Sequence, residues 1–117
     1  MWLERSELLL GKEGLERLTS ANVLIVGVGG VGAYAAEMLV RAGIGRVTIA
    51  DSDSVSESNI NRQLIALHST VGRIKTDVLA ERLIDINPEL QLSKTTCIIS
   101  CAVCTGKSRF PMRILGF

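Results

Sequence analysis

Residues 23–32 read VLIVGVGGVG, an apolar strand that runs directly into closely spaced glycines. In such a sequence Gly27 permits a tight turn, and Gly29, followed by Gly30, lets the backbone approach a phosphate. Gly32 lets the next helix pack close to the sheet. Free backbone N–H groups and the positive end of the helix dipole then face the anion. The stretch predicts a nucleotide-phosphate site without specifying the nucleotide.

The regular elements beyond this stretch predict an α/β fold. Residues 46–50 form a second strand rich in β-branched residues, which follows a helix without a hairpin turn and should lie parallel to the first. Residues 75–86 predict another helix, which ends at an Asn-Pro pair, and residues 90–92 open a third strand. We therefore expect a Rossmann-like, doubly wound and mostly parallel sheet, truncated to about three strands.

Apolar spacing also predicts further helical segments. A short N-terminal helix covers residues 12–18, and another short helix covers residues 59–67, across the mouth of the site. The helix between the first two strands should end at Gly43, a typical C-cap. Its core-facing stripe should consist of Val31, Tyr34, Ala35, Met38 and Leu39.

Two aspartates follow the second strand, at the edge where open α/β sheets bind ligands. Asp51 comes nineteen residues after Gly32, close to the spacing of about 20 at which an acid reaches the ribose hydroxyls in this fold. For Asp53, two residues further on, two roles stay open: a metal ligand or the cap of a turn. Asp51 is therefore the predicted ribose ligand.

Residues 59–75 supply the positive charge that a triphosphate needs. Arg62 can fork onto phosphate oxygens, and Lys75, at a helix start, can meet another phosphate. The amides of Asn59 and Gln63 offer neutral hydrogen bonds. A nicotinamide cofactor would leave both cations without a task. These residues favour a nucleoside triphosphate, with an NAD-dependent oxidoreductase as an alternative.

Composition narrows the class of protein. The chain has 117 residues, of which 47% are hydrophobic and 3% aromatic, and this suits one aliphatic α/β domain. No apolar run reaches the ~18–20 residues of a membrane span, and the N-terminus lacks the basic-then-apolar order of a secretion signal. We therefore expect a cytoplasmic protein without a membrane partner.

The order and spacing of these motifs resemble the ThiF/MoeB/HesA family, bacterial relatives of ubiquitin-activating enzymes that adenylate a carboxylate with ATP. The resemblance covers residues 4–92, so residues 1–92 are interpreted as the N-terminal part of a ThiF-type ATP-binding domain. The matching motifs are GVGGVG (27–32), AGIG (42–45), DSD (51–53), NINRQ (59–63), VGRIK (71–75) and INP (86–88).

The resemblance implies a role for each matching residue. Asp51 would bind the ribose, Asn59 and Arg62 would contact the nucleotide phosphates, and Lys75 would sit at the transferring phosphate. Arg5 resembles the arginine that this family lends across a homodimer to the partner's ATP. Cations placed beforehand stabilise the charge that builds on the phosphoryl oxygens and on departing pyrophosphate. The expected catalytic residues are thus Arg62, Lys75 and Arg5.

Within the family, the stretches VGAYAAE (31–37) and RQLIAL (62–67) most resemble the tRNA threonylcarbamoyladenosine dehydratases. Those enzymes activate the side-chain carboxylate of a modified adenosine, which cyclises with loss of water. The resemblance implies ATP and Mg2+ as cofactors and tRNA as the substrate. Two alternatives stay open: adenylation of the C-terminus of a ubiquitin-like or sulfur-carrier protein, and a fragment without turnover.

Residues 93–117 differ from the rest of the chain. Up to residue 92 there are 9 Lys+Arg and 12 Asp+Glu, a balance of −3, whereas the tail has 4 Lys+Arg and no acid, a balance of +4. Cys97, Cys101 and Cys104 have the spacing of an iron–sulfur loop, but the thirteen residues that follow are too few for the fold that carries such loops. We therefore expect no metal there.

Our hypothesis for this divergent tail is a shifted reading frame. The family continues after the third strand with a helix and a fourth strand whose aspartate handles magnesium and the adenylate, and no such pattern follows residue 92. Three strands would leave the edge and one apolar face of an inner strand uncovered. We therefore expect marginal stability.

Overall fold

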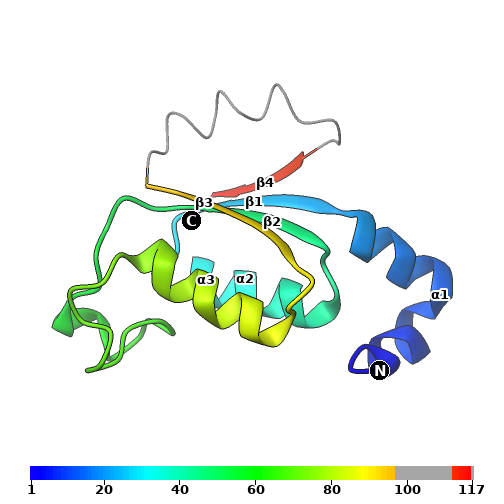
Figure 1. The fold of residues 1–117 in the computed structure, drawn as a ribbon, viewed down its shortest axis with the longest axis horizontal. Helices are drawn as coiled ribbons and strands as arrows, with labels where there is room; N and C mark the ends of the chain where they lie inside the picture. Colours follow the sequence, from blue (N-terminus) through cyan, green and yellow to red (C-terminus); the bar gives the residue numbers. More distant parts are fainter. Residues whose placement is uncertain (97–111, 117) are drawn as a thin grey trace.

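The computed structural model describes residues 1–96 and 112–116 of the chain. Four strands form one sheet, α2 and α3 lie together on one of its faces, and α1 projects beyond the amino end of β1 (Figure 1). None of the described helices combines the length and the apolarity that a membrane crossing needs. The elements are α1 (Glu4–Ser20), β1 (Asn22–Val26), α2 (Gly32–Ala42), β2 (Arg46–Ala50), the 3-10 turn η1 (Glu57–Asn59), α3 (Lys75–Ile86), β3 (Gln91–Thr95) and β4 (Met112–Gly116).

The described strands are all parallel and lie in the order β3-β2-β1-β4. The order reverses at β1, which makes the boundary between β1 and β4 the topological switch point of the sheet. Val26, the last residue of β1, is in register with Ala50 of β2 and Gly116 of β4. Three carboxyl ends therefore meet where the glycine-rich loop begins, and the predicted Rossmann-like class is confirmed.

The expected number of about three strands is wrong. Residues 112–116, within the segment that the sequence marked as divergent, form β4 and pair with β1 along its whole length. Strand β4 therefore covers the edge that we expected to be uncovered, and β1 is hydrogen-bonded to a strand on each side. Strand pairing depends on backbone groups, so it could form here without the family's side-chain pattern.

The core fills the space between the sheet and the two helices. Alternate residues of β1 and β2 face this core, as the two-residue period of a strand requires. Helix α3 has its predicted bounds, and its predicted apolar face is confirmed. Burying one such side chain contributes about 1.5–3 kcal/mol. The principal core residues are Val23, Ile25, Val47 and Ile49 from the strands, Ala33, Ala36 and Val40 from α2, and Val78, Leu79 and Leu83 from α3.

The predicted core face of α2 is wrong for its largest side chains. Val31, Tyr34 and Met38 are 62%, 49% and 66% exposed. The small residues Ala33 and Ala36 are fully buried in their place. A helix packed closely on a sheet leaves little room for bulky side chains, because protein interiors are close-packed. Close packing thus overrides the apolar stripe that the sequence suggested.

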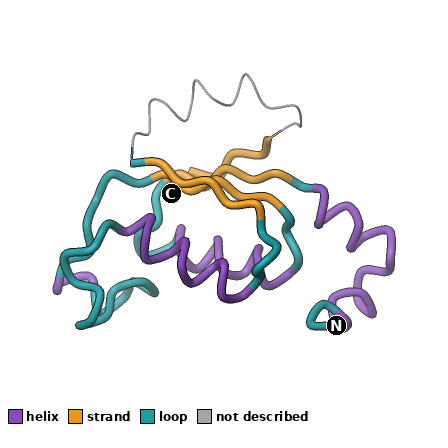
Figure 2. The backbone as a smooth tube through the Cα atoms, in the orientation of Figure 1, coloured by secondary structure: helices purple, strands orange, loops and turns teal. Residues whose placement is uncertain are grey.

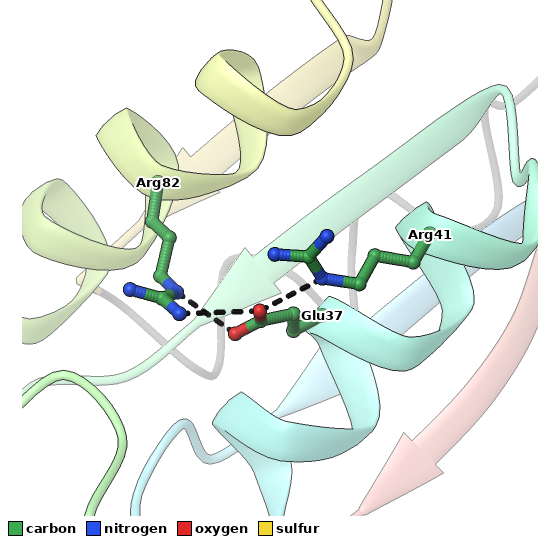
Figure 3. Close-up of polar contacts among 3 residues, drawn as sticks. All are labelled: Glu37, Arg41 and Arg82. Carbon is green, nitrogen blue, oxygen red and sulfur yellow. Dashed lines mark hydrogen bonds and ion pairs between the residues drawn. The ribbon is translucent and has the colours of Figure 1, made fainter. Parts of the chain in front are cut away.

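An ion-pair cluster joins α2 to α3 (Figure 3). The carboxylate of Glu37 accepts hydrogen bonds from Arg41 Nε at 2.9 Å and from Arg82 Nε at 2.8 Å. Hydrogen bonding to Arg82, reinforced by Arg41 and opposed by partial burial, lowers the pKa of Glu37 below its ordinary value. This contact links α2 to α3, and the sequence analysis did not predict it.

The N-terminal arm, α1, is longer than predicted and is broken in the middle. The expected helix over residues 12–18 extends over the whole of α1, but Gly11 has φ 75° and ψ 167° and interrupts it. Side-chain atoms of Leu3 and Leu15 lie next to the position that a Cβ on Gly43 would occupy. Gly43 itself has φ 117° and caps α2, which confirms its predicted role.

The helix expected over residues 59–67 does not form. The segment contains the end of η1 and a series of turns, which Figure 2 shows as part of a long loop beyond β2. Asn59 Oδ1 accepts a hydrogen bond from Ser56 N at 3.0 Å, and Thr70 Oγ1 accepts one from Leu67 N at 2.8 Å. Side chains that bond to nearby backbone in this way compete with helical hydrogen bonding.

Candidate nucleotide-binding site

The glycine-rich loop leaves β1 at the switch point and is tied at once to the neighbouring strand. Gly27 has φ 89°, a conformation that glycine adopts without strain, and its N–H donates to Ala50 O at 2.8 Å. The next N–H, of Val28, donates to Asp51 Oδ2 at 2.9 Å. The predicted tight turn is thus present, and the end of β2 holds it.

Asp51 is a buried carboxylate that organises this corner. The residue is 7% exposed, and its second oxygen, Oδ1, accepts a hydrogen bond from Asp53 N at 2.7 Å. Each carboxylate oxygen has a further lone pair, so Asp51 can still accept a ribose hydroxyl while it holds the loop. The sequence spacing suggested the ligand role but gave no sign of this tethering role.

Lys75 lies near the two aspartates through backbone pairing. Ser54 and Ile74 form an antiparallel bridge, and Lys75 N donates to Asp53 O at 3.1 Å. Lys75 is 6% exposed, and none of the ion pairs among residues 1–96 and 112–116 includes it. Its ammonium group has no carboxylate partner among the described residues, so it is available to a bound anion.

In the segment NINRQ (59–63), Asn59 stabilises the local turn, whereas Arg62 is exposed. The Oδ1 atom of Asn59 caps η1, which leaves the side-chain amino group as the donor that this residue can offer a ligand. Arg62 is exposed, and its Nη1 donates to Ser58 O and to Asn61 Oδ1, both at 3.0 Å. Arg62 is therefore held at the surface of the loop with guanidinium donors left over.

Gln63 and the glycines meet directly. A Cβ built on Gly29 would lie 3.5 Å from Gln63 Nε2, whereas one built on Gly30 would meet no described atom within 4 Å. The side of the loop at Gly30 is therefore open among the described atoms, whereas Gln63 covers it at Gly29. Gly32 is buried and begins α2, as expected for close helix–sheet packing.

Arg5 is not brought to this site within one chain. It is exposed on α1, and α1 lies at the opposite end of the molecule from the loop between β2 and α3 (Figure 1). The three cysteines considered for an iron–sulfur cluster lie outside the described residues. The structure thus assembles the predicted glycines, Asp51, Asp53, Gln63 and Lys75, and leaves Arg5 apart.

The described part of the chain holds no group of three or more His, Cys, Asp or Glu side chains placed to bind one metal ion. The sequence of β4, MRILG, contains no carboxylate, so this strand does not provide the magnesium-handling aspartate that the family resemblance implies. Within residues 1–96 and 112–116, a magnesium site made by three or more protein side chains is therefore not present. No chemical step below depends on one.

The geometry suits a polyphosphate bound at the carboxyl edge of the sheet. The N–H groups at the start of α2 follow the glycine-rich loop, and the segment between β2 and α3 carries the exposed Arg62 and ends at the buried residue Lys75. Such donors, held before the ligand arrives, can stabilise charge that develops on phosphoryl oxygens. Asp51 provides an acceptor for a hydroxyl group of the same ligand.

Comparisons with known proteins agree with this geometry. A sequence profile of the ThiF family matches residues 3–101. The chain is 53% identical over 88 residues to the tRNA threonylcarbamoyladenosine dehydratase of Bacillus subtilis, a match that covers 75% of this chain and 35% of the relative. It is 42% identical over 81 residues to the molybdopterin-synthase adenylyltransferase of Salmonella typhimurium, covering 69% of this chain and 32% of the relative.

Solved structures give the same result for the fold. The crystal structure of Escherichia coli tRNA N6-threonylcarbamoyladenosine dehydratase in complex with ATP superposes with a TM-score of 0.88 at 36% identity. That match covers 97% of this chain and 47% of the solved one. The chain spans about a third of the length of the curated relatives that it matches.

Proposed function

We propose that this chain, which belongs to the ThiF family, is the nucleotide-binding part of an enzyme that uses ATP to adenylate a carboxylate. The observation that carries the proposal is the buried Lys75, which lacks a carboxylate partner among the described residues and lies beside the glycine-rich loop's tether, Asp51. ATP bound to a structure 36% identical to this chain supports the choice of nucleotide.

The proposed substrate is the threonylcarbamoyl carboxylate of a modified adenosine in tRNA. The identity of 53% to a tRNA threonylcarbamoyladenosine dehydratase supports this substrate over the others used in the family. A carboxylate oxygen would attack the α-phosphorus of ATP, forming one P–O bond while the bond to pyrophosphate breaks. The activated carboxyl group would then cyclise and release AMP, so that the substrate has lost one water.

The residues of this chain have separate tasks in that reaction. Lys75 and Arg62 would stabilise negative charge on the α-phosphoryl oxygens and on departing pyrophosphate. Asp51 would hold the ribose while it tethers the loop. The carboxylate is already ionised at neutral pH, so the first step needs no general base.

A homodimer would explain the position of Arg5. In one chain, α1 lies at the end opposite the β2–α3 loop, so Arg5 can serve a nucleotide only on a second copy. Mixing Arg5→Ala chains with Lys75→Met chains tests this arrangement, because a shared site would restore ATP binding in part of the mixed dimers. Unchanged ATP affinity in Arg5→Ala alone would contradict it.

The test of function uses the full chain and two matched pairs of variants. ATP binding is measured by calorimetry, and release of labelled pyrophosphate is measured with tRNA that carries threonylcarbamoyladenosine. Lys75→Met should reduce pyrophosphate release by ~10²–10³. The controls are Lys12→Met and Arg17→Ala, which change exposed α1 cations and should leave both measurements unchanged. If NAD binds more tightly than ATP and Arg62→Ala has no effect, the proposal is wrong and an oxidoreductase is favoured.

A second candidate is adenylation of a carrier protein's C-terminus. The identity of 42% to a molybdopterin-synthase adenylyltransferase favours it. Both candidates share the chemistry at the α-phosphorus and differ in the carboxylate presented to it. Pyrophosphate release with a sulfur-carrier protein, and none with modified tRNA, would favour this second candidate.

A further inference from the structure

Gln63 is buried against the glycine-rich loop in a way that the proposed function does not explain. The residue is 8% exposed, and its amide atoms Nε2, Cδ and Oε1 lie 3.5, 3.8 and 3.9 Å from the position of a Cβ on Gly29. The backbone of Gln63 is itself held, because its N–H donates to Asn59 O at 2.9 Å. The side chain thus rests on the loop from a fixed base.

The Oε1 atom of Gln63 is fully buried and has no hydrogen-bond partner within the described part of the chain. A buried carbonyl oxygen without a donor is unfavourable, and native proteins keep few of them. The backbone N–H groups of Gly29 and Gly30 also lack partners, since no backbone hydrogen bond among the described residues uses either of them. An unpaired acceptor therefore lies close to Gly29, whose own N–H is unpaired among the described residues.

We propose that Gln63 is a positioning residue that couples the glycine-rich loop to nucleotide binding. When a phosphate occupies the open side at Gly30, the loop adjusts so that Gly29 N–H donates to Gln63 Oε1. Gly30 N–H and the start of α2 then remain for the phosphate. This inference rests on the proposed function, because the ligand that triggers the adjustment is a nucleoside triphosphate.

The coupling predicts opposite effects of one substitution on stability and on ATP affinity, whereas a packing role predicts a loss of both. In the free protein the unpaired Oε1 destabilises the fold, and in the bound protein its new hydrogen bond adds to affinity. Replacing the amide with an apolar side chain of the same length therefore leaves the free protein equally stable or more stable. The same replacement weakens ATP binding, so stability and affinity do not fall together.

The test compares Gln63→Met with Gln91→Met, in the full chain. Gln91 is an exposed glutamine on β3, which makes it a matched control. Thermal melting without ligand and ATP titration by calorimetry are measured for both. Gln63→Met should melt at the same temperature as the unmodified chain or higher, and should bind ATP about fivefold more weakly, as expected for one lost hydrogen bond. Gln91→Met should change neither value.

A second variant, Gln63→Glu, keeps the size of the side chain and adds a negative charge beside the phosphate. It should weaken ATP binding more than Gln63→Met does, because like charges repel in a poorly solvated site. Equal affinities in all variants would overturn the proposal, and so would Gln63→Met losing stability or failing to fold. If the unmodified chain does not bind ATP, the proposed function fails first and this inference fails with it.

Discussion

The carboxyl edge of the sheet and the N-terminal arm differ in how firmly the rest of the molecule holds them. At the carboxyl edge, the glycine-rich loop is bonded to the buried carboxylate of Asp51 and covered by the buried amide of Gln63. Helix α1 contains no buried residue, and Leu8 and Leu9 are 78% and 83% exposed. The more polar of the two regions is therefore the more constrained.

This difference shows that apolar character alone does not predict which residues matter. Leu8 and Leu9 are typical core residues by composition, yet the described chain gives them few neighbours. Asp51 is a typical surface residue by composition, yet two backbone N–H groups depend on it. The effect of a substitution should therefore follow the partners that are lost, and the variants below test this from the largest effect to the smallest.

The largest effect is expected where the arm joins the body, at Gly45. A Cβ at this position would lie 1.9 Å from the carbonyl oxygen of Thr19, and backbone cannot move away cheaply. Gly45→Ala should therefore lower the free energy of unfolding by about 3 kcal/mol or more. Urea denaturation measures this change in the free energy of unfolding. Gly30→Ala is the control, because a Cβ on Gly30 would meet no described atom within 4 Å. Equal stability of the two variants would contradict the contact.

Removing the tether of the glycine-rich loop should come next. Asp51→Ala leaves the N–H groups of Val28 and Asp53 without their acceptor, and should cost about 2–3 kcal/mol of stability. The denaturation midpoint of Asp51→Ala is compared with that of Asp85→Ala. Asp85 is exposed, so its replacement should change stability by no more than about 0.5 kcal/mol. If both variants were equally stable, the loop would not depend on this carboxylate.

The Glu37 cluster should have a smaller effect that depends on pH. Its two arginines are half exposed, so Glu37→Gln should cost about 1 kcal/mol at neutral pH. Because the pKa of Glu37 is lowered in the fold, its contribution is complete above the ordinary glutamate pKa and is lost as pH falls through the lowered value. The stability difference between the two proteins should therefore disappear in acid.

Melting curves between neutral and acidic pH measure this effect, and Glu13→Gln provides the comparison. Glu13 forms an ion pair with Arg17 on α1 in which both side chains are about four-fifths exposed, so its loss should have almost no effect on stability. A constant difference between the unmodified protein and Glu37→Gln across the whole pH range would show that the carboxylate charge is not what joins α2 to α3.

The smallest effect is expected in the arm itself. Leu9→Ala should change stability by less than about 0.5 kcal/mol, because an exposed leucine loses few contacts. Leu15→Ala should cost about 1 kcal/mol, since Leu15 is half-buried and packs against the position of Gly43. Thermal melting of the two variants measures the difference. A larger loss of stability in Leu9→Ala than in Leu15→Ala would show that the exposed leucines hold the arm.

Much of the fold could be predicted from local patterns. The bounds of α3, the parallel pairing of β1 with β2, the tight turn at Gly27 and the cap at Gly43 are confirmed. Each depends on residues within a few positions of one another, or on backbone conformations that favour glycine. The roles assigned to Arg62, Lys75 and Arg5 stay predictions, because no ligand contact tests them.

The failures have equally specific causes. The face of α2 was misjudged because its spacing contains two apolar sides, and the helix packs its small residues against the sheet. The helix expected over residues 59–67 gives way to side-chain caps at Asn59 and Thr70. Strand β4 was not predicted, because its segment differs in composition from the rest of the chain.

The sequence by itself determined the turn after β1, the helices α2 and α3, the strand β2 and the family motifs that identify the site. The tertiary structure decided which groups meet: Val28 with Asp51 across 23 positions, Glu37 with Arg82 across 45, and Gln63 with Gly29. Turns and periodic faces follow from the local geometry of the backbone, and the sequence displays them directly. Contacts between distant residues depend on how closely the packed elements approach, and this emerges once the whole sheet and its helices are assembled.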